Sequence, residues 1–309
     1  MVGNYRSATE RPEVLEANFE KQLAAGMMVK TTYGQAQEDY PGRLRVASLG
    51  ALEQKEGEFR ITHDGTHGAR VNAAIRVRDQ EACPTAHDLV AALDREILER
   101  EVLAPDAAVR PQSRLFALAL DVSMAHRRVP IRRDDWGLQA CSSLPLGVLP
   151  GPMDDVWVNT VGTYGIGSIS YWWGRLGALL QRLLLYVVGP AGLLWVFRFA
   201  DDFIWITGNR SGWRPLVLAM LLLRTLGVPI KWEKFRGGRQ VDWIGYFFDL
   251  ERCESGVSDK RSAWAADWRR RMSESVEIHL GDFRGGLGRL GFAAALLLYT
   301  KPFLDPLYA

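Results

Sequence analysis

The chain has 309 residues, of which 48% are hydrophobic and 24% are charged, the balance of an ordinary globular protein. This composition excludes a disordered or collagen-like chain, and the length predicts one large domain with subdomains or two small domains. The three cysteines are far apart and in no CxxC pair, which excludes a disulfide scaffold and a cysteine-based zinc site. The net charge of +2 is too small to indicate nucleic-acid binding by itself, but it leaves room for a local basic groove.

The sequence also argues against secretion and membrane insertion. Its N-terminus lacks the apolar core of a signal peptide. The apolar run 183–197 has 15 residues without a charge and contains Gly189-Pro190, whereas a spanning helix needs about 20 apolar residues. We therefore favour a buried helix, a turn and a buried strand over a membrane segment. We expect a soluble intracellular protein, cytoplasmic or nuclear, because free cysteines suit a reducing compartment.

Hydrophobic spacing predicts helices and strands in alternation. Apolar residues that recur every three or four positions indicate helices, and continuous or alternating apolar runs indicate strands. The polar, proline-interrupted segment 34–50 is predicted to be a loop. This order of elements predicts an α+β or α/β fold. The elements are a helix (10–28), two β-prone runs (within 58–79), a helix (85–103), a strand (115–120), a helix (168–187), a hairpin (195–207), a helix (217–226), a strand pair (240–250) and two helices (258–272 and 283–298).

Three pairs of adjacent aspartates are candidates for chemistry. Asp134-Asp135 follows two arginines and Asp154-Asp155 follows a Gly-Pro turn signal, so we expect both pairs to be solvated and structural. Asp201-Asp202 lies between two β-prone apolar runs, at the tip of the predicted hairpin. Two carboxylates at such a tip are unfavourable without a cation, and Mg²⁺ prefers carboxylate and phosphate oxygens.

Asp121 supplies a further carboxylate, because it follows the apolar run 115–120 at the point where a buried strand reaches the edge of its sheet. Three carboxylates at two strand ends are the ligand set of a two-metal site for phosphoryl transfer. The alternative is a β-hairpin with an acidic turn and no metal.

Six motifs follow one another along the chain. They are 59–64 (FRITHD) with 71–72, 120–130 (LDVSMAHRRVP), 164–168 (YGIGS), 199–202 (FADD), 227–234 (GVPIKWEK) and 243–246 (WIGY), and a tail with 286–292 (GLGRLGF) and 301–304 (KPFL) comes after them. In this order they resemble the polymerase domain of reverse transcriptases, of the retrotransposon type, over nearly the whole chain.

The resemblance implies a role for each matching residue. Asp121, Asp201 and Asp202 would be catalytic and hold two Mg²⁺ ions, or Mn²⁺, with Asp202 the more peripheral ligand. The implied nucleotide-binding residues are Arg60, Val122, His126, Tyr164, Gly165 and Lys234. The implied primer and template contacts are Ser168, Trp243, Gly245 and Tyr246. The structural alternatives are an ion pair of Arg60 with Asp64 or Glu58, and core positions for Trp243 and Tyr246.

The fold implied by the resemblance is an α+β right-hand polymerase, with an antiparallel palm sheet backed by helices. Residues 1–112 would form an N-terminal helix and the fingers, and 113–250 the palm, with a fingers insertion around 131–160. Residues 251–309 would form a truncated thumb or connection. The chain would thus be one part of a larger retroelement protein, or a shortened copy.

The implied activity is that of an RNA-directed DNA polymerase, in which a primer 3′-hydroxyl attacks a dNTP on an RNA template or an RNA–DNA hybrid. His126 stands where the family usually has an aromatic residue that blocks the ribose 2′-hydroxyl, so selectivity between dNTP and rNTP stays open. The alternatives are a decayed copy that only binds nucleic acid, and another palm-type nucleotidyltransferase or cyclase. The expected phosphate contacts are Arg70, Arg76, Arg78, Arg127, Arg128, Arg132, Arg133, Arg269, Arg270, Arg271, Arg284 and Arg289.

Overall fold

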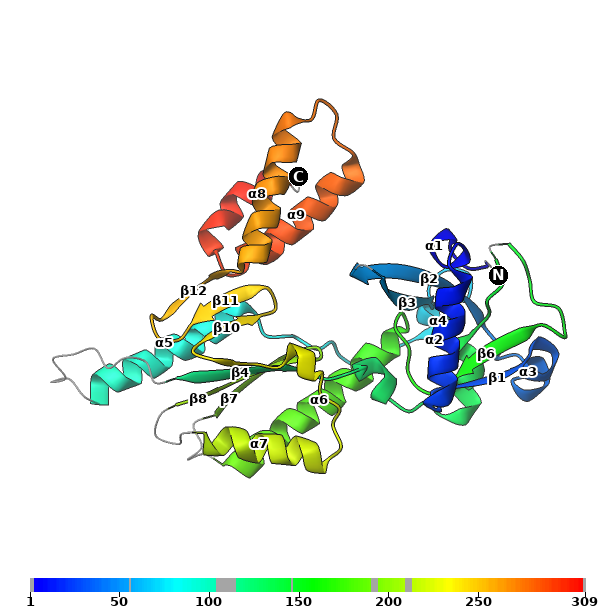
Figure 1. The fold of residues 1–309 in the computed structure, drawn as a ribbon, viewed down its shortest axis with the longest axis horizontal. Helices are drawn as coiled ribbons and strands as arrows, with labels where there is room; N and C mark the ends of the chain where they lie inside the picture. Colours follow the sequence, from blue (N-terminus) through cyan, green and yellow to red (C-terminus); the bar gives the residue numbers. More distant parts are fainter. Residues whose placement is uncertain are drawn as a thin grey trace. The chain divides into compact units, whose positions relative to one another are not determined.

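The computed structural model describes residues 3–55, 57–103, 115–145, 147–189, 194–208 and 213–307. These residues form a mixed α/β fold with several sheets and divide into two compact units (Figure 1). Unit 1 comprises Met1–Glu81 and Met124–Leu176, and unit 2 comprises Ala82–Ser123 and Gly177–Ala309. One of the three boundaries between the units falls within helix α6 (Gly167–Val188), after Leu176.

Unit 1 is built on a five-stranded sheet, in the order β1-β6-β5-β2-β3 among its described residues. Neighbouring strands are antiparallel except for β2 and β5, which are parallel. Helix α2 packs on this sheet through Phe19, whose ring stacks on Trp157 with the centroids 4.3 Å apart. The strands are β1 (Met28–Thr32), β2 (Val46–Lys55), β3 (Glu58–Asp64), β5 (Ala140–Cys141) and β6 (Asp155–Asn159). The helices are α1 (Arg6–Thr9), α2 (Pro12–Ala24), α3 (Tyr33–Asp39) and α4 (Val71–Ala74), with the 3₁₀ helices η1 (Ala125–Arg128) and η2 (Arg133–Gln139).

Unit 2 contains two antiparallel sheets in its described part, one in the order β7-β8-β4-β9 and one in the order β10-β11-β12. The strands are β4 (Phe116–Asp121), β7 (Leu194–Phe199), β8 (Asp202–Thr207), β9 (Arg236–Gly238), β10 (Gln240–Trp243), β11 (Tyr246–Asp249) and β12 (Glu254–Val257). The helices are α5 (Ala86–Leu103), α7 (Arg214–Thr225), α8 (Asp259–Glu274), α9 (Leu280–Ala294) and α10 (Lys301–Leu304), with the 3₁₀ helices η4 (Trp232–Lys234), η5 (Leu298–Thr300) and η6 (Asp305–Leu307).

The four-stranded sheet of unit 2 is covered on both faces. Ala117, Ile206 and their same-face neighbours pack against α5 and the three-stranded sheet. On the opposite face, α6 contacts β7, since Gln181 Nε2 donates to the carbonyl of Val196 at 2.7 Å, and α7 packs on β8. Because both faces are buried, β4 and β8 carry continuous apolar runs rather than alternating ones.

Most of the predicted elements are confirmed, with their ends shifted by a few residues. The confirmed elements are the helices at 85–103, 168–187, 217–226, 258–272 and 283–298, the strand at 115–120, the hairpin at 195–207 and the strand pair at 240–250. The proposed Gly189-Pro190 turn lies partly outside the described residues. No helix in the described ranges is both long enough and apolar enough to cross a membrane.

In the N-terminal part, one prediction is confirmed over a shorter range and two are wrong. The helix expected over 10–28 is present but ends at Ala24, because Gly26 adopts a left-handed φ of +67°, and Met28 begins a strand. The segment 34–50 is not a loop, since it contains most of α3 and the start of β2. The second β-prone run of 58–79 forms the short helix α4 and irregular structure, because β3 pairs with the preceding strand β2 instead.

Candidate active site

The strand register in unit 2 brings two of the predicted carboxylates to one edge of the sheet. Asp121, the last residue of β4, pairs with Asp202, the first residue of β8. Paired residues of antiparallel strands have Cα atoms roughly 4.5–5.5 Å apart, so the two side chains are neighbours. Asp201 lies in the two-residue turn between β7 and β8, and its carbonyl accepts a hydrogen bond from the Val122 amide at 3.0 Å.

The carboxylates influence one another electrostatically. Burial, followed by the negative charges of Asp121 and Asp201, raises the pKa of Asp202 to about 6, although Lys234 opposes the shift. Burial and the two neighbouring carboxylates thus disfavour the ionised form of Asp202, which a cation bound at this edge of the sheet would favour.

Two lysines provide positive charge at Asp121. The chain after Val228 runs beside the end of β4, because the Ser123 amide donates to the Pro229 carbonyl at 2.8 Å and the Lys231 amide to the Asp121 carbonyl at 3.0 Å. Lys231 Nζ lies 2.8 Å from Asp121 Oδ1, and Lys234 Nζ lies 2.5 Å from Oδ2. Asp121 itself is only 2% exposed, and each oxygen of its carboxylate contacts one of the two ammonium groups.

Of the two lysines, only Lys234 was predicted at the site from the sequence. Lys231 could have been identified from the spacing Lys231-x-x-Lys234 at a 3₁₀ turn, because residues three apart in such a turn lie on the same side. Partial burial lowers the pKa of Lys234, but the hydrogen bond to Asp121 and the charges of Asp121 and Asp202 outweigh it, so the pKa is raised.

The donor atoms of this site favour a metal ion, whereas their arrangement opposes one. Carboxylate oxygens are the donors that Mg²⁺ prefers, and burial together with the charges of Asp121 and Asp201 raises the pKa of Asp202. The described residues nevertheless contain no group of three or more His, Cys, Asp or Glu side chains arranged to hold a metal. In addition, Lys231 and Lys234 occupy both carboxylate oxygens of Asp121. The donor chemistry therefore fits a divalent cation, which must displace or share these ammonium groups.

The turn that carries Asp201 is supported from behind by Arg198, a residue that sequence reasoning did not single out. Ala200 in this turn has a left-handed φ of +53°, which is unfavourable for a residue other than glycine. The buried Arg198 donates from Nη1 to the Ala200 carbonyl at 2.8 Å. Its guanidinium packs against Gly177 of α6, where an added Cβ would lie 2.7 Å from Nε.

In unit 1 the structure brings together three of the predicted nucleotide-binding residues. The Arg60 guanidinium lies over the Tyr164 ring, 5.4 Å from its centroid, and the His126 ring lies 4.6 Å from the same ring. Arg60 is exposed and, within the part of the chain that the structure describes, forms no ion pair with Asp64 or Glu58. The ion-pair alternative for Arg60 is therefore wrong.

The loop that follows Tyr164 has a conformation that requires glycine. Gly165 has a φ of +99°, and an added Cβ would lie 1.7 Å from the His63 carbonyl oxygen. Asn72 fixes this loop, because its Nδ2 donates to the Gly165 carbonyl at 2.8 Å and its Oδ1 accepts from the Gly167 amide at 2.9 Å. Ser168 lines a cavity of about 550 Å³ in the same unit.

The predicted primer-contact residues lie mainly in the core of unit 2. Trp243 and Tyr246 are buried, and the Tyr246 hydroxyl donates to the Phe292 carbonyl, so the core alternative describes their side chains correctly. Gly245 between them has a φ of +85°, and an added Cβ would meet the Arg261 side chain. Val122 is buried as well, and its amide bonds to the Asp201 carbonyl.

The expected phosphate contact through Arg127 is wrong. Its guanidinium is buried and donates to the Gln22 and Asn159 side chains and to the carbonyls of Met27 and Gly162, all within unit 1. Burial lowers the pKa of Arg127 to about 10. Arg127 therefore joins α2, η1 and β6 instead of facing a nucleic acid.

No protein-family model and no curated protein matches the sequence. A solved structure of a foamy viral protease–reverse transcriptase dRH in complex with double-stranded DNA is similar to this chain, with a TM-score of 0.62 and 14% sequence identity. The similarity covers 95% of this chain, which spans 43% of the length of that protein. The mixed α/β fold therefore resembles part of a reverse transcriptase.

Proposed function

We propose that the chain is an RNA-directed DNA polymerase, which extends a primer by attack of its 3′-hydroxyl on a dNTP. The proposal rests mainly on the pairing of Asp121 with Asp202, beside Asp201, in a fold similar to part of a reverse transcriptase. We assign the palm to 113–250, the fingers to 1–112 with the insertion around 131–160, and the thumb or connection to 251–309.

The aspartates would bind the metal ions of this reaction. Asp121 and Asp201 would be the principal ligands, and Asp202 would be the more peripheral one. Two Mg²⁺ ions, or Mn²⁺, would activate the primer hydroxyl and neutralise charge on the transferring phosphoryl group. Lys234 stays protonated, since its pKa is raised, and can donate a hydrogen bond to the leaving pyrophosphate.

Unit 1 would bind the incoming nucleotide. The Arg60 guanidinium has the planar fork that binds a phosphate with two hydrogen bonds, and it is exposed. Tyr164 and His126 present adjacent rings on which a sugar can rest, and the Gly165 loop lets the backbone approach closely. Ser168, Trp243, Gly245 and Tyr246 remain the proposed primer and template contacts, with Trp243 and Tyr246 acting through their backbone because their side chains are buried.

A second candidate is a catalytically decayed module that binds nucleic acid. The observation that favours it is the pairing of both Asp121 oxygens with Lys231 and Lys234. In that case the lysines would permanently neutralise the carboxylate and no metal would bind.

Primer extension on an RNA template with dNTPs and Mg²⁺ tests the proposal, with the native chain and Asp201→Asn compared. We expect extension by the native chain and a loss of at least about 100-fold in the variant, the scale expected when a charge-stabilising group is removed. Asp134→Asn is the matched control, because this exposed aspartate forms a surface ion pair with Arg132. Equal activity of all three proteins would contradict the site, and folded, inert proteins that bind the template would support the second candidate.

A further inference from the structure

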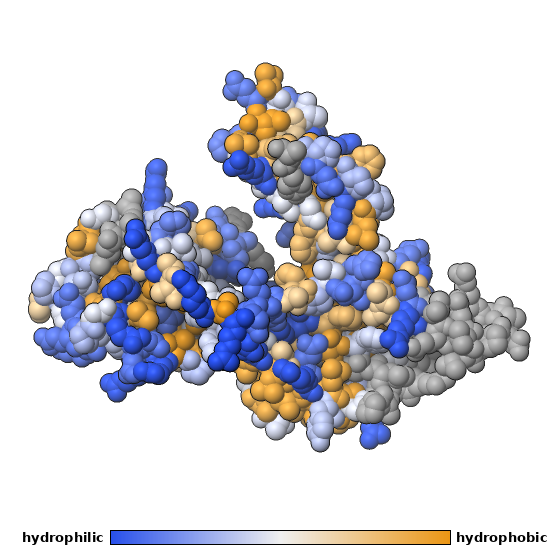
Figure 2. Space-filling model, turned by 180° about the vertical axis from the view of Figure 1, so that it is seen from behind, coloured by the Kyte–Doolittle hydropathy of each residue, from blue (hydrophilic) through white to orange (hydrophobic). Residues whose placement is uncertain are grey.

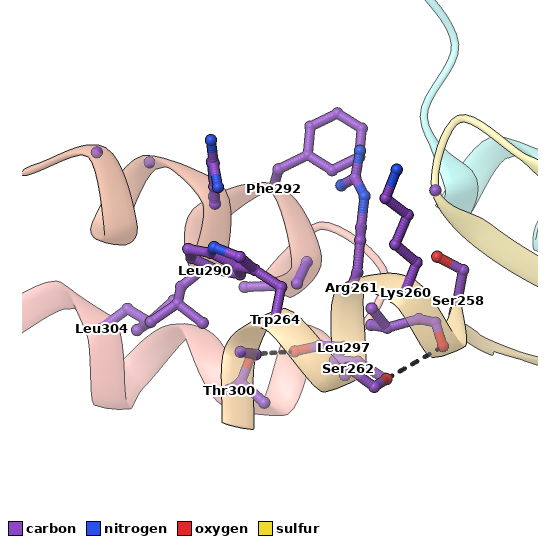
Figure 3. Close-up of a pocket in the computed structure, with 18 of the residues that line it drawn as sticks. Ser258, Lys260, Arg261, Ser262, Trp264, Leu290, Phe292, Leu297, Thr300 and Leu304 are labelled. Carbon is purple, nitrogen blue, oxygen red and sulfur yellow. Dashed lines mark hydrogen bonds between the residues drawn. The ribbon is translucent and has the colours of Figure 1, made fainter. Parts of the chain in front are cut away.

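Unit 2 contains a cavity of about 1180 Å³ between α8, α9 and the turn at Gly245 (Figure 3). Small-molecule sites in proteins typically measure about 300–1,000 Å³, so this cavity can hold a ligand of drug size or slightly larger. Much of the lining is aliphatic and aromatic. The large apolar residues are Val257, Trp264, Leu290, Phe292, Leu297, Phe303 and Leu304.

The charged residues of the cavity are all cationic. Lys260, Arg261 and Arg289 line it, and the lining contains no aspartate or glutamate. In the described residues none of the three forms an ion pair. Farther along α8, by contrast, Arg270 and Arg271 both pair with Asp267.

Aromatic rings take the place of carboxylates around two of these cations. The Arg261 guanidinium lies 4.2 Å from the centroid of Phe292, and that of Arg289 lies 4.9 Å from the centroid of Trp264. Stacking on a ring fixes the plane of a guanidinium but leaves its N–H donors unused. Figure 3 shows Lys260 and Arg261 extending from the start of α8 in the same direction. The cavity therefore combines orientated, unpaired positive charge with an apolar wall.

We propose that this cavity binds an amphipathic organic anion, with a carboxylate, sulfonate or phosphate head and an apolar or aryl body. The head would be held by Arg261, Arg289 and Lys260, and the body by the apolar lining around Leu290 and Leu297. The backbone of a nucleic acid fits less well, since its phosphates carry no apolar body to fill such a concave wall. The proposal does not depend on the polymerase activity proposed above.

The test compares two fluorescent probes that share one body, 8-anilinonaphthalene-1-sulfonate and its uncharged parent N-phenyl-1-naphthylamine. The full chain should bind the sulfonate at one site, as measured by fluorescence titration and calorimetry, and at least about tenfold more tightly than the parent. Arg261→Gln and Arg289→Gln should each weaken sulfonate binding about tenfold, the loss of one charge-assisted contact. Binding of the parent should not change. Arg269→Gln is the matched control, because Arg269 lies on α8 outside this cavity.

Several results would overturn the proposal. They are the absence of saturable sulfonate binding, equal binding of the two probes, and unchanged binding in both arginine variants. Dodecanoate should displace the sulfonate, whereas displacement by duplex DNA but not by dodecanoate would assign the cations to a nucleic-acid surface and contradict the proposal. Circular dichroism confirms that each variant is folded, and Lys260→Gln serves in place of any arginine variant that is not.

Discussion

At the scale of single residues, Asp121 decides the charge balance of the candidate site. Its carboxylate is almost fully buried and is neutralised by two lysines that lie 110 and 113 residues further along the chain. Removing one partner of a buried ion pair leaves an uncompensated charge, which destabilises a protein more than the pair itself stabilises it. The same ammonium groups compete with any divalent cation for the carboxylate.

Replacing Lys231 should therefore have opposite effects on the free protein and on cation binding. We expect Lys231→Met to lower the free energy of unfolding by about 1–3 kcal/mol without Mg²⁺, less than for a fully buried pair because the lysine side chain is 26% exposed. Added Mg²⁺ should then raise the unfolding midpoint of the variant more than that of the native chain.

Thermal unfolding with and without Mg²⁺ measures both effects. The matched control is Lys30→Met, which removes a surface ion pair with Asp155 and should cost less than about 1 kcal/mol. Identical responses of the native chain and the Lys231 variant to Mg²⁺ would contradict competition between this lysine and a cation.

At the scale of elements, the β7–β8 hairpin depends on the helix packed behind it. The turn at Ala200 is held by Arg198, and Arg198 occupies space that exists only because residue 177 of α6 has no side chain. The position of Asp201 is thus linked to α6 through one guanidinium.

Gly177→Ala should destabilise the protein even though alanine is the better helix former. The added Cβ would lie 2.7–2.9 Å from three atoms of the buried Arg198 side chain, and overpacking of this kind costs about 1–3 kcal/mol. Gly288→Ala in α9 is the control, because its Cβ would meet nothing within 4 Å and should stabilise the helix by up to about 1 kcal/mol. Urea unfolding compares the two variants, and a stabilised Gly177→Ala protein would disprove the link.

At the scale of the whole molecule, the buried His63 makes stability depend on pH. His63 is 3% exposed, and burial, together with the charge of Arg127, lowers its pKa from 6.5 to about 4. Between these two values the unfolded chain binds a proton that the folded chain does not. The contribution of neutral, buried His63 to the free energy of unfolding is therefore fully present above about pH 6.5 and is lost as the pH falls from 6.5 towards 4.

The pKa shift of His63 corresponds to a loss of roughly 3 kcal/mol in the free energy of unfolding over this pH window. His63→Gln should flatten the pH dependence of the unfolding free energy between pH 7 and pH 5, as measured by urea titration at each pH. Asp64, whose pKa is lowered to about 2 with burial opposing the shift and the Tyr5 and His67 hydrogen bonds causing it, acts only in a more acidic range. An unchanged slope in the variant would contradict the role of His63.

Most helices and strands, and the positions of the three candidate aspartates at strand ends, could be predicted from the sequence. Periodicity within one segment identifies a helix or strand, and the end of an apolar run locates Asp121, because both signals are local. The pairing of β3 with β2, the burial of Arg127 and the support of the site by Lys231 and Arg198 could not be predicted in this way. Each of these contacts depends on which segments meet in the folded chain, and no local pattern encodes contacts between residues a hundred positions apart.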